Sequence, residues 1–232
     1  MLVFVHSPLV GPLTFQPVAD RLAAAGERVA VADLTGAMAG PPPYQPRLVD
    51  AVAEAAEPAG GPTVLIGHSG AGPLLPGVAA RLAVPVRALV FVDAGLPYPG
   101  RSWFETAPPD LVDRLRGLAS GDRLPPWHTW FPAEVLDTLL PEQELRERFT
   151  GQLGPLPLDY FREPMPPQDW SGPAGYLLLS EAYRDDATRA AGAGMPVLER
   201  ISHHLATLTS PEVVAGAVRD LVAAVEAQRK TP

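Results

Sequence analysis

The 232-residue sequence contains no cysteine, and its only lysine is Lys230. Without cysteine there is no disulfide framework, no thiol nucleophile and no cysteine-based metal site. Basic residues are also scarce, because 18 of them face 26 acidic residues and the formal net charge is −8. Such a chain has no basic stripe to neutralise a phosphate backbone, and it lacks a G-x-x-x-x-G-K-[ST] phosphate loop. Nucleic acid is therefore excluded as an expected partner.

Long apolar runs are missing as well. The first run, at residues 2–5, ends before the polar residues His6 and Ser7. It is too short for a signal peptide or a membrane span. With 47% hydrophobic and 19% charged residues, the composition is typical of one globular domain. We expect a soluble, cytoplasmic protein with no membrane partner.

The chain alternates short apolar strands with amphipathic helices. This alternation predicts an α/β protein with a mostly parallel, doubly wound sheet that is covered on both faces. The expected strands are residues 2–5, 29–32, 63–66, 88–92, 176–179 and 197–200, and the expected helices are 15–25, 47–57, 70–82 and 211–227.

Residues 94–172 interrupt this alternation. The segment is rich in proline and carries two helical patterns, at 111–118 and 142–149. We predict a helical cap subdomain, inserted into a core formed by residues 1–93 and 173–232. Its aromatic side chains either line a substrate pocket or attach the cap to the core. All four tryptophans lie here: Trp103, Trp127, Trp130 and Trp170.

The most informative stretch lies between residues 62 and 82. An apolar strand ends at Gly67, followed by His68, Ser69 and Gly70, and then by a helical pattern. A sharp strand-to-helix turn needs small neighbours and exposes the residue at its tip, so Ser69 is predicted to be the nucleophile of a nucleophile elbow. The pattern Gly-x-Ser-x-Gly is met in part, because Ala71 takes the last position. The start of the helix would direct N–H groups and a positive dipole toward a forming oxyanion.

Two other interpretations of this stretch stay open. One is a dinucleotide-binding loop, with Asp93 in the place of a ribose-binding acid. However, the glycine spacing differs from G-x-G-x-x-G, and the loop follows the third strand instead of the first. The other is a glycine-rich turn that contains an unrelated serine.

A serine nucleophile needs an adjacent base, which an acid orients. The pair His203-His204 follows the strand at 197–200, so it lies at the same sheet edge as Ser69. We expect His204 to be the base, because it directly precedes an apolar segment that can anchor it. His203 is expected to be a loop histidine.

Several segments, taken in order, resemble those of α/β-hydrolases of the compact, capped type, to which plant hydroxynitrile lyases and methylesterases belong. The resemblance covers nearly the whole chain and implies the α/β-hydrolase fold with a helical cap insertion. It places the nucleophile at Ser69 and the base at His204. The segments are Phe4-Val-His-Ser-Pro-Leu-Val-Gly11, Val31-Ala-Asp-Leu34, Gly67-His-Ser69, Phe91-Val-Asp-Ala94 and His204-Leu-Ala-Thr-Leu208.

The resemblance leaves the acid open. In most of the family it stands three residues after the small residue that ends the penultimate strand, and this chain has Tyr183 there. Other members carry it directly after the strand that follows the elbow helix, where this chain has Asp93. A buried aspartate at a strand end is costly unless it is paired, which favours Asp93. Glu181 is the second candidate and Asp185 the third.

The expected oxyanion hole departs from the family pattern. In related enzymes the first strand is followed by His-Gly-x, whose last N–H is an oxyanion donor, whereas this chain has His6-Ser7-Pro8 and proline has no N–H. The Gly70 N–H remains as one donor. We expect the second donor to be the Leu9 N–H or the Ser7 hydroxyl, although that hydroxyl could instead satisfy the local turn.

Together these residues predict a serine hydrolase that acts on an ester or thioester with an apolar or aromatic group. Ser69 would attack, His204 would transfer the proton and Asp93 would hold the imidazolium. The alternatives are a lyase or cyclase that uses Ser69 and His204 as an acid–base pair, and a ligand-binding pseudo-hydrolase. Neither a metal nor an organic cofactor is expected, because no histidine and acidic residues show metal-ligand spacing. The expected partner is the small-molecule substrate, and a homodimer is left open.

Overall fold

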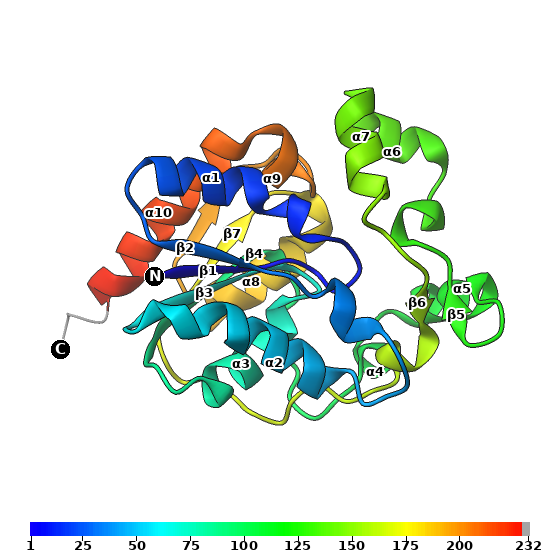
Figure 1. Ribbon diagram of the computed structural model, residues 1–232, viewed down its shortest axis with the longest axis horizontal. Coiled ribbons are helices and arrows are strands. Elements are labelled where there is room, and N and C mark those ends of the chain that lie inside the picture. The colour runs from blue at the N-terminus through cyan, green and yellow to red at the C-terminus, as the bar shows by residue number, and fades with distance from the viewer. Residues whose placement is uncertain (229–232) are drawn as a thin grey trace.

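The computed structural model describes residues 1–228 and contains a six-stranded sheet at its centre (Figure 1). Every neighbouring pair of strands in this sheet is parallel, so their carboxyl ends lie at one edge. The predicted α/β fold with a mostly parallel sheet is thereby confirmed. In spatial order the strands are β2 (Val29–Ala32), β1 (Leu2–Val5), β3 (Thr63–Ser69), β4 (Val86–Ala94), β7 (Ala174–Leu178) and β8 (Val197–Glu199).

Helices cover both faces of this sheet, because successive strand residues point to opposite sides. On one face the helices pack over Phe4, Ile66 and Val90, and on the other over Val5 and Leu65. Figure 1 shows the two layers on either side of the strands. The first layer consists of α1 (Gln16–Ala24), α9 (Ala206–Thr209) and α10 (Pro211–Gln228), and the second of α2 (Gln45–Ala56), α3 (Leu75–Arg81) and α8 (Arg184–Gly192).

Two helices differ from the prediction. The helix expected at 70–82 begins as an α-helix only at Leu75, after a 3₁₀ turn at Gly72–Leu74. Pro73 and Pro76 lack N–H groups, so the early backbone uses shorter-range bonds, such as that from the Leu74 N–H to the Ala71 carbonyl. Helix α8 was not predicted, because its buried residues are alanines and it has no apolar stripe.

The segment between β4 and β7 forms a separate group of short elements. Its helices α6 and α7 project at one end of the molecule (Figure 1). They pack through Leu136, Leu140 and Phe149 against Val10 and Leu205 of the core, next to the expected base. The elements are α4 (Trp103–Thr106), α5 (Pro109–Leu118), β5 (Arg123–Leu124), α6 (Ala133–Leu139), α7 (Gln143–Thr150) and β6 (Leu156–Pro157).

Short 3₁₀ turns connect several of these elements. Those at Trp127–Trp130 and Glu181–Tyr183 carry residues that lie near the sheet edge discussed below. Across residues 1–228, no helix has the length and apolarity required to cross a membrane. The other turns are Pro12–Thr14, Thr35–Met38, Glu57–Ala59 and Leu158–Phe161.

Candidate active site

Ser69 lies at the carboxyl end of β3, at the tip of a tight turn. Its φ angle is +56°, a left-handed conformation that residues other than glycine rarely adopt. The turn leaves little space, because a Cβ added to Gly72 would come within 2.1 Å of the Gly95 carbonyl oxygen. Backbone strain of this kind clusters at functional sites, where it directs a side chain outward. The local geometry is that of an elbow.

Asp93 occupies a second strained position, at the end of the neighbouring strand β4. Its φ angle is +44°. His68 pairs with Val92 while Ser69 pairs with Ala94, so Asp93 is an extra residue at this point in β4. An extra residue of this kind bends the strand and re-aims its side chain. The phenol of Tyr176 fixes the bend by accepting from the Ala94 N–H at 3.1 Å and donating to the Ala94 carbonyl at 2.8 Å.

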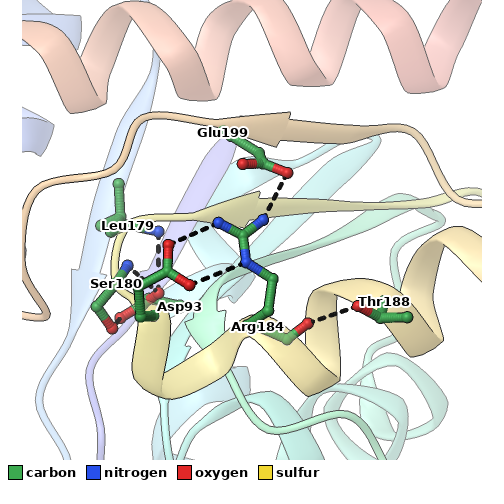
Figure 2. A network of polar contacts seen from close by, with 7 residues as sticks. Asp93, Leu179, Ser180, Arg184, Thr188 and Glu199 are labelled. Carbon is green, nitrogen blue, oxygen red and sulfur yellow. Dashed lines mark hydrogen bonds and ion pairs between the residues drawn. The ribbon is translucent and has the colours of Figure 1, made fainter.

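The re-aimed Asp93 carboxylate is fully buried and fully hydrogen-bonded, and Figure 2 shows it beside Leu179 and Ser180. One oxygen accepts from the N–H groups of Leu179 and Ser180 at 2.9 and 2.8 Å. The other accepts from the Ser180 hydroxyl at 2.6 Å and from His204 Nδ1 at 2.7 Å. Burial raises the pKa of Asp93, but the bonds from His204, Ser180 and Leu179 outweigh it and hold the pKa below its ordinary value. The carboxylate is therefore ionised at neutral pH.

The His204 ring is held on its faces as well as at Nδ1. The His68 ring stacks on it with centroids 4.4 Å apart, and His68 Nε2 donates to the His204 carbonyl at 3.0 Å. Burial, followed by the charge of protonated His204, lowers the pKa of His68 to about 3, so His68 is a neutral support. The Tyr183 ring also stacks on His204, at 5.0 Å and 13° between planes. These contacts leave the imidazole 18% exposed.

The Ser69 hydroxyl contacts Tyr183 directly. Ser69 Oγ and the Tyr183 hydroxyl are 3.1 Å apart. Among residues 1–228, Tyr183 is the one hydrogen-bond partner of Ser69 Oγ, and the His204 ring does not bond to it. Burial raises the pKa of the Tyr183 phenol, so the hydroxyl remains protonated.

The other predicted acids lie away from His204. Glu181 is exposed and pairs with Arg184 at 2.7 Å, and Arg184 also reaches Glu199 at 2.7 Å, as Figure 2 shows for Arg184 and Glu199. Asp185 is exposed on the first turn of α8. His203 instead has its Nε2 2.9 Å from the Thr209 hydroxyl. Of the acids considered from sequence, the structure brings Asp93 to His204.

The loop after β1 approaches the elbow from the side of β3 that lies away from β4 and Asp93. A Cβ added to Gly70 would lie 2.9 Å from Ser7 Oγ, so this hydroxyl lies against the Gly70 backbone. The Leu9 N–H donates to Ser7 Oγ at 3.3 Å. His6 anchors the loop, because its Nε2 accepts from the Leu34 N–H and its Nδ1 donates to the Ser7 carbonyl. In the described part of the chain, the Gly70 N–H has no hydrogen-bond partner.

A cavity of about 290 Å³ opens beside Ser69 and Gly70. Its wall combines apolar side chains, two phenols and the Asp186–Arg189 ion pair, and part of it comes from the segment after β4. A larger cavity of about 650 Å³ lies between α2, α3 and residues 163–168, and Ser69 does not line it. The described residues hold no cluster of three histidine or acidic side chains that could bind a metal ion. The smaller cavity is lined by Leu96, Tyr98, Trp103, Ala107, Pro108 and Tyr183, among others.

The aromatic residues of the predicted cap divide between two roles. Trp103 lines the cavity at Ser69, and the Trp127 ring lies 6.5 Å from the His204 ring. Trp130 instead packs within the segment, with its ring tilted against that of Phe161. The Trp170 indole bonds to the Pro173 carbonyl. Two of the four tryptophans therefore lie near the site.

Sequence reasoning did not assign a role to Tyr183, Ser180 or His68. Tyr183 stands three residues after the small residue that ends the penultimate strand, where the family pattern expects the acid. This spacing was the sequence signal for it. Ser180 is the small residue that precedes this position by three, but its bonds to Asp93 depend on tertiary structure. His68 follows from no sequence signal, because its stacking on His204 depends on tertiary structure.

The comparisons with known proteins agree with this fold. The family model described as alpha/beta hydrolase family matches residues 2–217. No curated protein sequence matches the chain. Among solved structures, an extracellular alpha/beta-hydrolase from a Paenibacillus species has a TM-score of 0.76 at 18% identity, covering 97% of this chain and 98% of its own. It is described as sharing structural and functional homology with tobacco salicylic acid binding protein 2.

Two further structures have the same fold. A pyrethroid hydrolase from Sphingobium faniae has a TM-score of 0.71 at 21% identity, covering 96% of this chain and 97% of its own. Tomato methylketone synthase I, in complex with 2-tridecanone, has a TM-score of 0.72 at 17% identity, covering 97% and 98%. At these identities the similarity is one of fold.

Proposed function

This chain is an enzyme of the alpha/beta hydrolase family, and we propose that it hydrolyses carboxylic esters or thioesters through a Ser69–His204–Asp93 triad. The observation that carries the proposal is the short bond from His204 Nδ1 to the buried Asp93 carboxylate, at 2.7 Å. An aspartate in this position fixes the tautomer of the imidazole and leaves Nε2 to act as a base.

In the proposed reaction, Ser69 Oγ attacks the carbonyl carbon of the ester and its proton passes to His204 Nε2. The bond from carbon to the leaving oxygen or sulfur then breaks, and His204 returns the proton to that atom. Water hydrolyses the acyl-enzyme with His204 again as base, which releases the acid and restores Ser69. Because Ser69 contacts Tyr183 in the free protein, its hydroxyl must turn toward His204 before attack.

The oxyanion would be stabilised from the β1 side of Ser69. The Gly70 N–H, which has no partner among residues 1–228, supplies one donor. For the second we favour the Ser7 hydroxyl over the Leu9 N–H, because the latter already donates to Ser7 Oγ. That bond leaves the Ser7 hydroxyl proton to point elsewhere. Preorganised donors of this kind are worth about 10²–10³ in rate each.

The cavity at Ser69 sets the proposed substrate class. At about 290 Å³ it holds a short group, and Leu96, Trp103 and Pro108 give its wall an apolar part. We therefore favour esters in which one part is small and apolar or aromatic.

Esterase assays with Ser69→Ala test the proposal. We expect wild-type protein to hydrolyse p-nitrophenyl esters whose acyl chains have about two to eight carbons. Ser69→Ala should lower kcat by about 10⁴-fold or more. Ser171→Ala is the matched control, because Ser171 is exposed in a loop. Thermal melts of both variants should match the wild type. A Ser69→Ala variant with activity within tenfold of the wild type would contradict the proposal.

A second candidate function is a lyase or cyclase reaction in which Ser69 and His204 act as an acid–base pair. The observation in its favour is the loop after β1, where Pro8 has no N–H to offer an oxyanion. A weaker oxyanion hole impairs acyl transfer more than proton transfer. The absence of any covalent Ser69 adduct during turnover of a native substrate would favour this candidate.

The cytoplasmic location and the homodimer stay predictions. Fractionation of the native host cells would test the first, and sedimentation analysis of the purified protein would test the second.

A further inference from the structure

The Tyr183 hydroxyl touches the reacting oxygen of the proposed mechanism, yet the triad does not use it. It lies 3.1 Å from Ser69 Oγ and lines the cavity that opens at Ser69. A substrate bound in that cavity therefore meets both groups. The scissile oxygen of a bound ester is attached to the carbon that Ser69 attacks, so a donor in contact with Ser69 Oγ is within reach of that oxygen as well.

Sheet topology places Tyr183 on the leaving-group side of Ser69. In the strand order β1-β3-β4-β7, Ser69 ends β3, the Ser7 loop follows β1 and Tyr183 follows β7. The proposed oxyanion donors thus approach from one side. Tyr183 approaches from the other, where His204 also stands. A group on the side of the base faces the atom that the base must protonate.

Two contacts fix the phenol in this place. Its ring stacks on the His204 ring at 5.0 Å, nearly in parallel. The 3₁₀ turn Glu181–Tyr183 begins directly after Ser180, whose N–H and hydroxyl both bond to Asp93. The hydroxyl also keeps its proton, because burial raises the pKa of Tyr183. The site therefore holds a permanent donor whose position is coupled to the base.

On the basis of the proposed hydrolysis, we propose that Tyr183 is a catalytic residue that donates a hydrogen bond to the leaving oxygen of an ester. As the Ser69 Oγ–carbon bond forms and the carbon–oxygen bond breaks, negative charge gathers on the leaving oxygen. The Tyr183 O–H stabilises this charge while His204 delivers the proton, and Tyr183 keeps its own.

This role narrows the substrate class to oxygen esters of aliphatic alcohols. An alkoxide leaving group is strongly basic, so a donor stabilises it greatly. A p-nitrophenolate leaves readily without help, and a thiolate sulfur is a weaker hydrogen-bond acceptor than an alkoxide oxygen. The donor therefore gives its advantage to alkyl esters over activated esters and thioesters.

The test compares two leaving groups on one acyl group. We would measure kcat/KM for ethyl butyrate and p-nitrophenyl butyrate with wild type and Tyr183→Phe, which keeps the ring and removes the hydroxyl. Because kcat/KM reports acylation, deacylation does not mask the effect. We expect Tyr183→Phe to lose about 10- to 100-fold on ethyl butyrate. On p-nitrophenyl butyrate we expect a loss below about threefold, since its leaving group needs little assistance.

Tyr160→Phe is the matched control, because Tyr160 is buried against Phe161 and does not line the cavity at Ser69. It should leave both rates unchanged. Equal losses on the two esters with Tyr183→Phe would overturn the inference, since they would mean that the hydroxyl only positions Ser69. A gain in rate would also overturn it, because Tyr183 would then only restrain Ser69. In both cases an inactive Ser69→Ala variant would still support the proposed hydrolysis. A wild type that is inactive on both esters, with Ser69 unlabelled by a fluorophosphonate, would overturn both proposals.

Discussion

On the β7 side of Ser69, Asp93 accepts four hydrogen bonds, from Leu179, twice from Ser180 and from His204. On the β1 side, the Gly70 N–H has no partner among residues 1–228, and the Leu9 N–H donates only to Ser7 Oγ at 3.3 Å. The first side handles protons and the second would receive the oxyanion. Their difference follows from what each side must do before the substrate arrives.

A buried carboxylate is costly at all times unless its oxygens are satisfied. The β7 side is therefore complete in the free protein. An oxyanion donor, in contrast, must stay available until charge develops on the substrate. An incomplete β1 side is thus compatible with catalysis, provided that its donors are already in position. Substitutions on each side of Ser69 test this contrast.

The largest effect is expected on the β7 side, from Asp93→Asn. The amide cannot hold the imidazolium and favours the wrong tautomer of His204, so kcat for ester hydrolysis should fall by about 10⁴-fold. Glu181→Gln is the control, because Glu181 pairs with Arg184 on the surface, and it should stay within about twofold of the wild type. Steady-state kinetics of both variants show which acid orients His204. A damaging Glu181→Gln beside a near-normal Asp93→Asn would assign the acid to the later strand.

A smaller effect is expected on the β1 side, from Ser7→Ala. If the Ser7 hydroxyl is the second oxyanion donor, its removal should lower kcat by about 10²-fold. Pro8→Gly should be neutral or harmful, because proline sets the loop that carries Ser7. A rise in esterase rate with Pro8→Gly would show that the hole lacks a backbone donor. If neither variant changed the esterase rate, this loop would not form the oxyanion site.

The smallest effect is expected on stability, from Ser180→Ala. The Ser180 hydroxyl bonds to the ionised Asp93, and a bond to a charged group contributes about 1.5–3 kcal/mol. The folded-state pKa of Asp93 lies below its ordinary value of 3.8, so this contribution is fully present above that value and is lost as the pH falls through the folded-state pKa. Urea unfolding of wild type and Ser180→Ala between pH 3 and pH 7 measures it. A difference in unfolding free energy that grows toward acid pH would contradict the assignment.

The sequence predicts the sheet well, because buried parallel strands carry continuous apolar runs between turn residues. It also places Ser69 and His204 at one edge of the sheet, since both follow strands whose carboxyl ends lie there. The elbow helix was misplaced, because its apolar spacing suggested a start at Gly70 while Pro73 and Pro76 delay the α-helix to Leu75. The apolar periodicity of a sequence reflects its side chains. It does not show where proline removes a backbone N–H group.

The contacts of Tyr183 and His68 could not be predicted from sequence. Both rings stack on His204, and this stacking depends on how the segments after β3 and β7 meet in three dimensions. The direction of the Asp93 side chain could not be predicted either, because it depends on one extra residue in β4 relative to β3. Strand patterns fix which residues end a strand, but they do not fix such local shifts in register.

The most direct test of the account is covalent labelling of Ser69. After incubation with an ethyl fluorophosphonate, intact-protein mass spectrometry should show one adduct per chain, and the modified peptide should contain Ser69. The adduct should be absent from Ser69→Ala and should form much more slowly in Asp93→Asn, because the base is no longer oriented. An unlabelled wild type, or a Ser69→Ala variant labelled as fast as the wild type, would contradict the claim that Ser69 is an activated nucleophile.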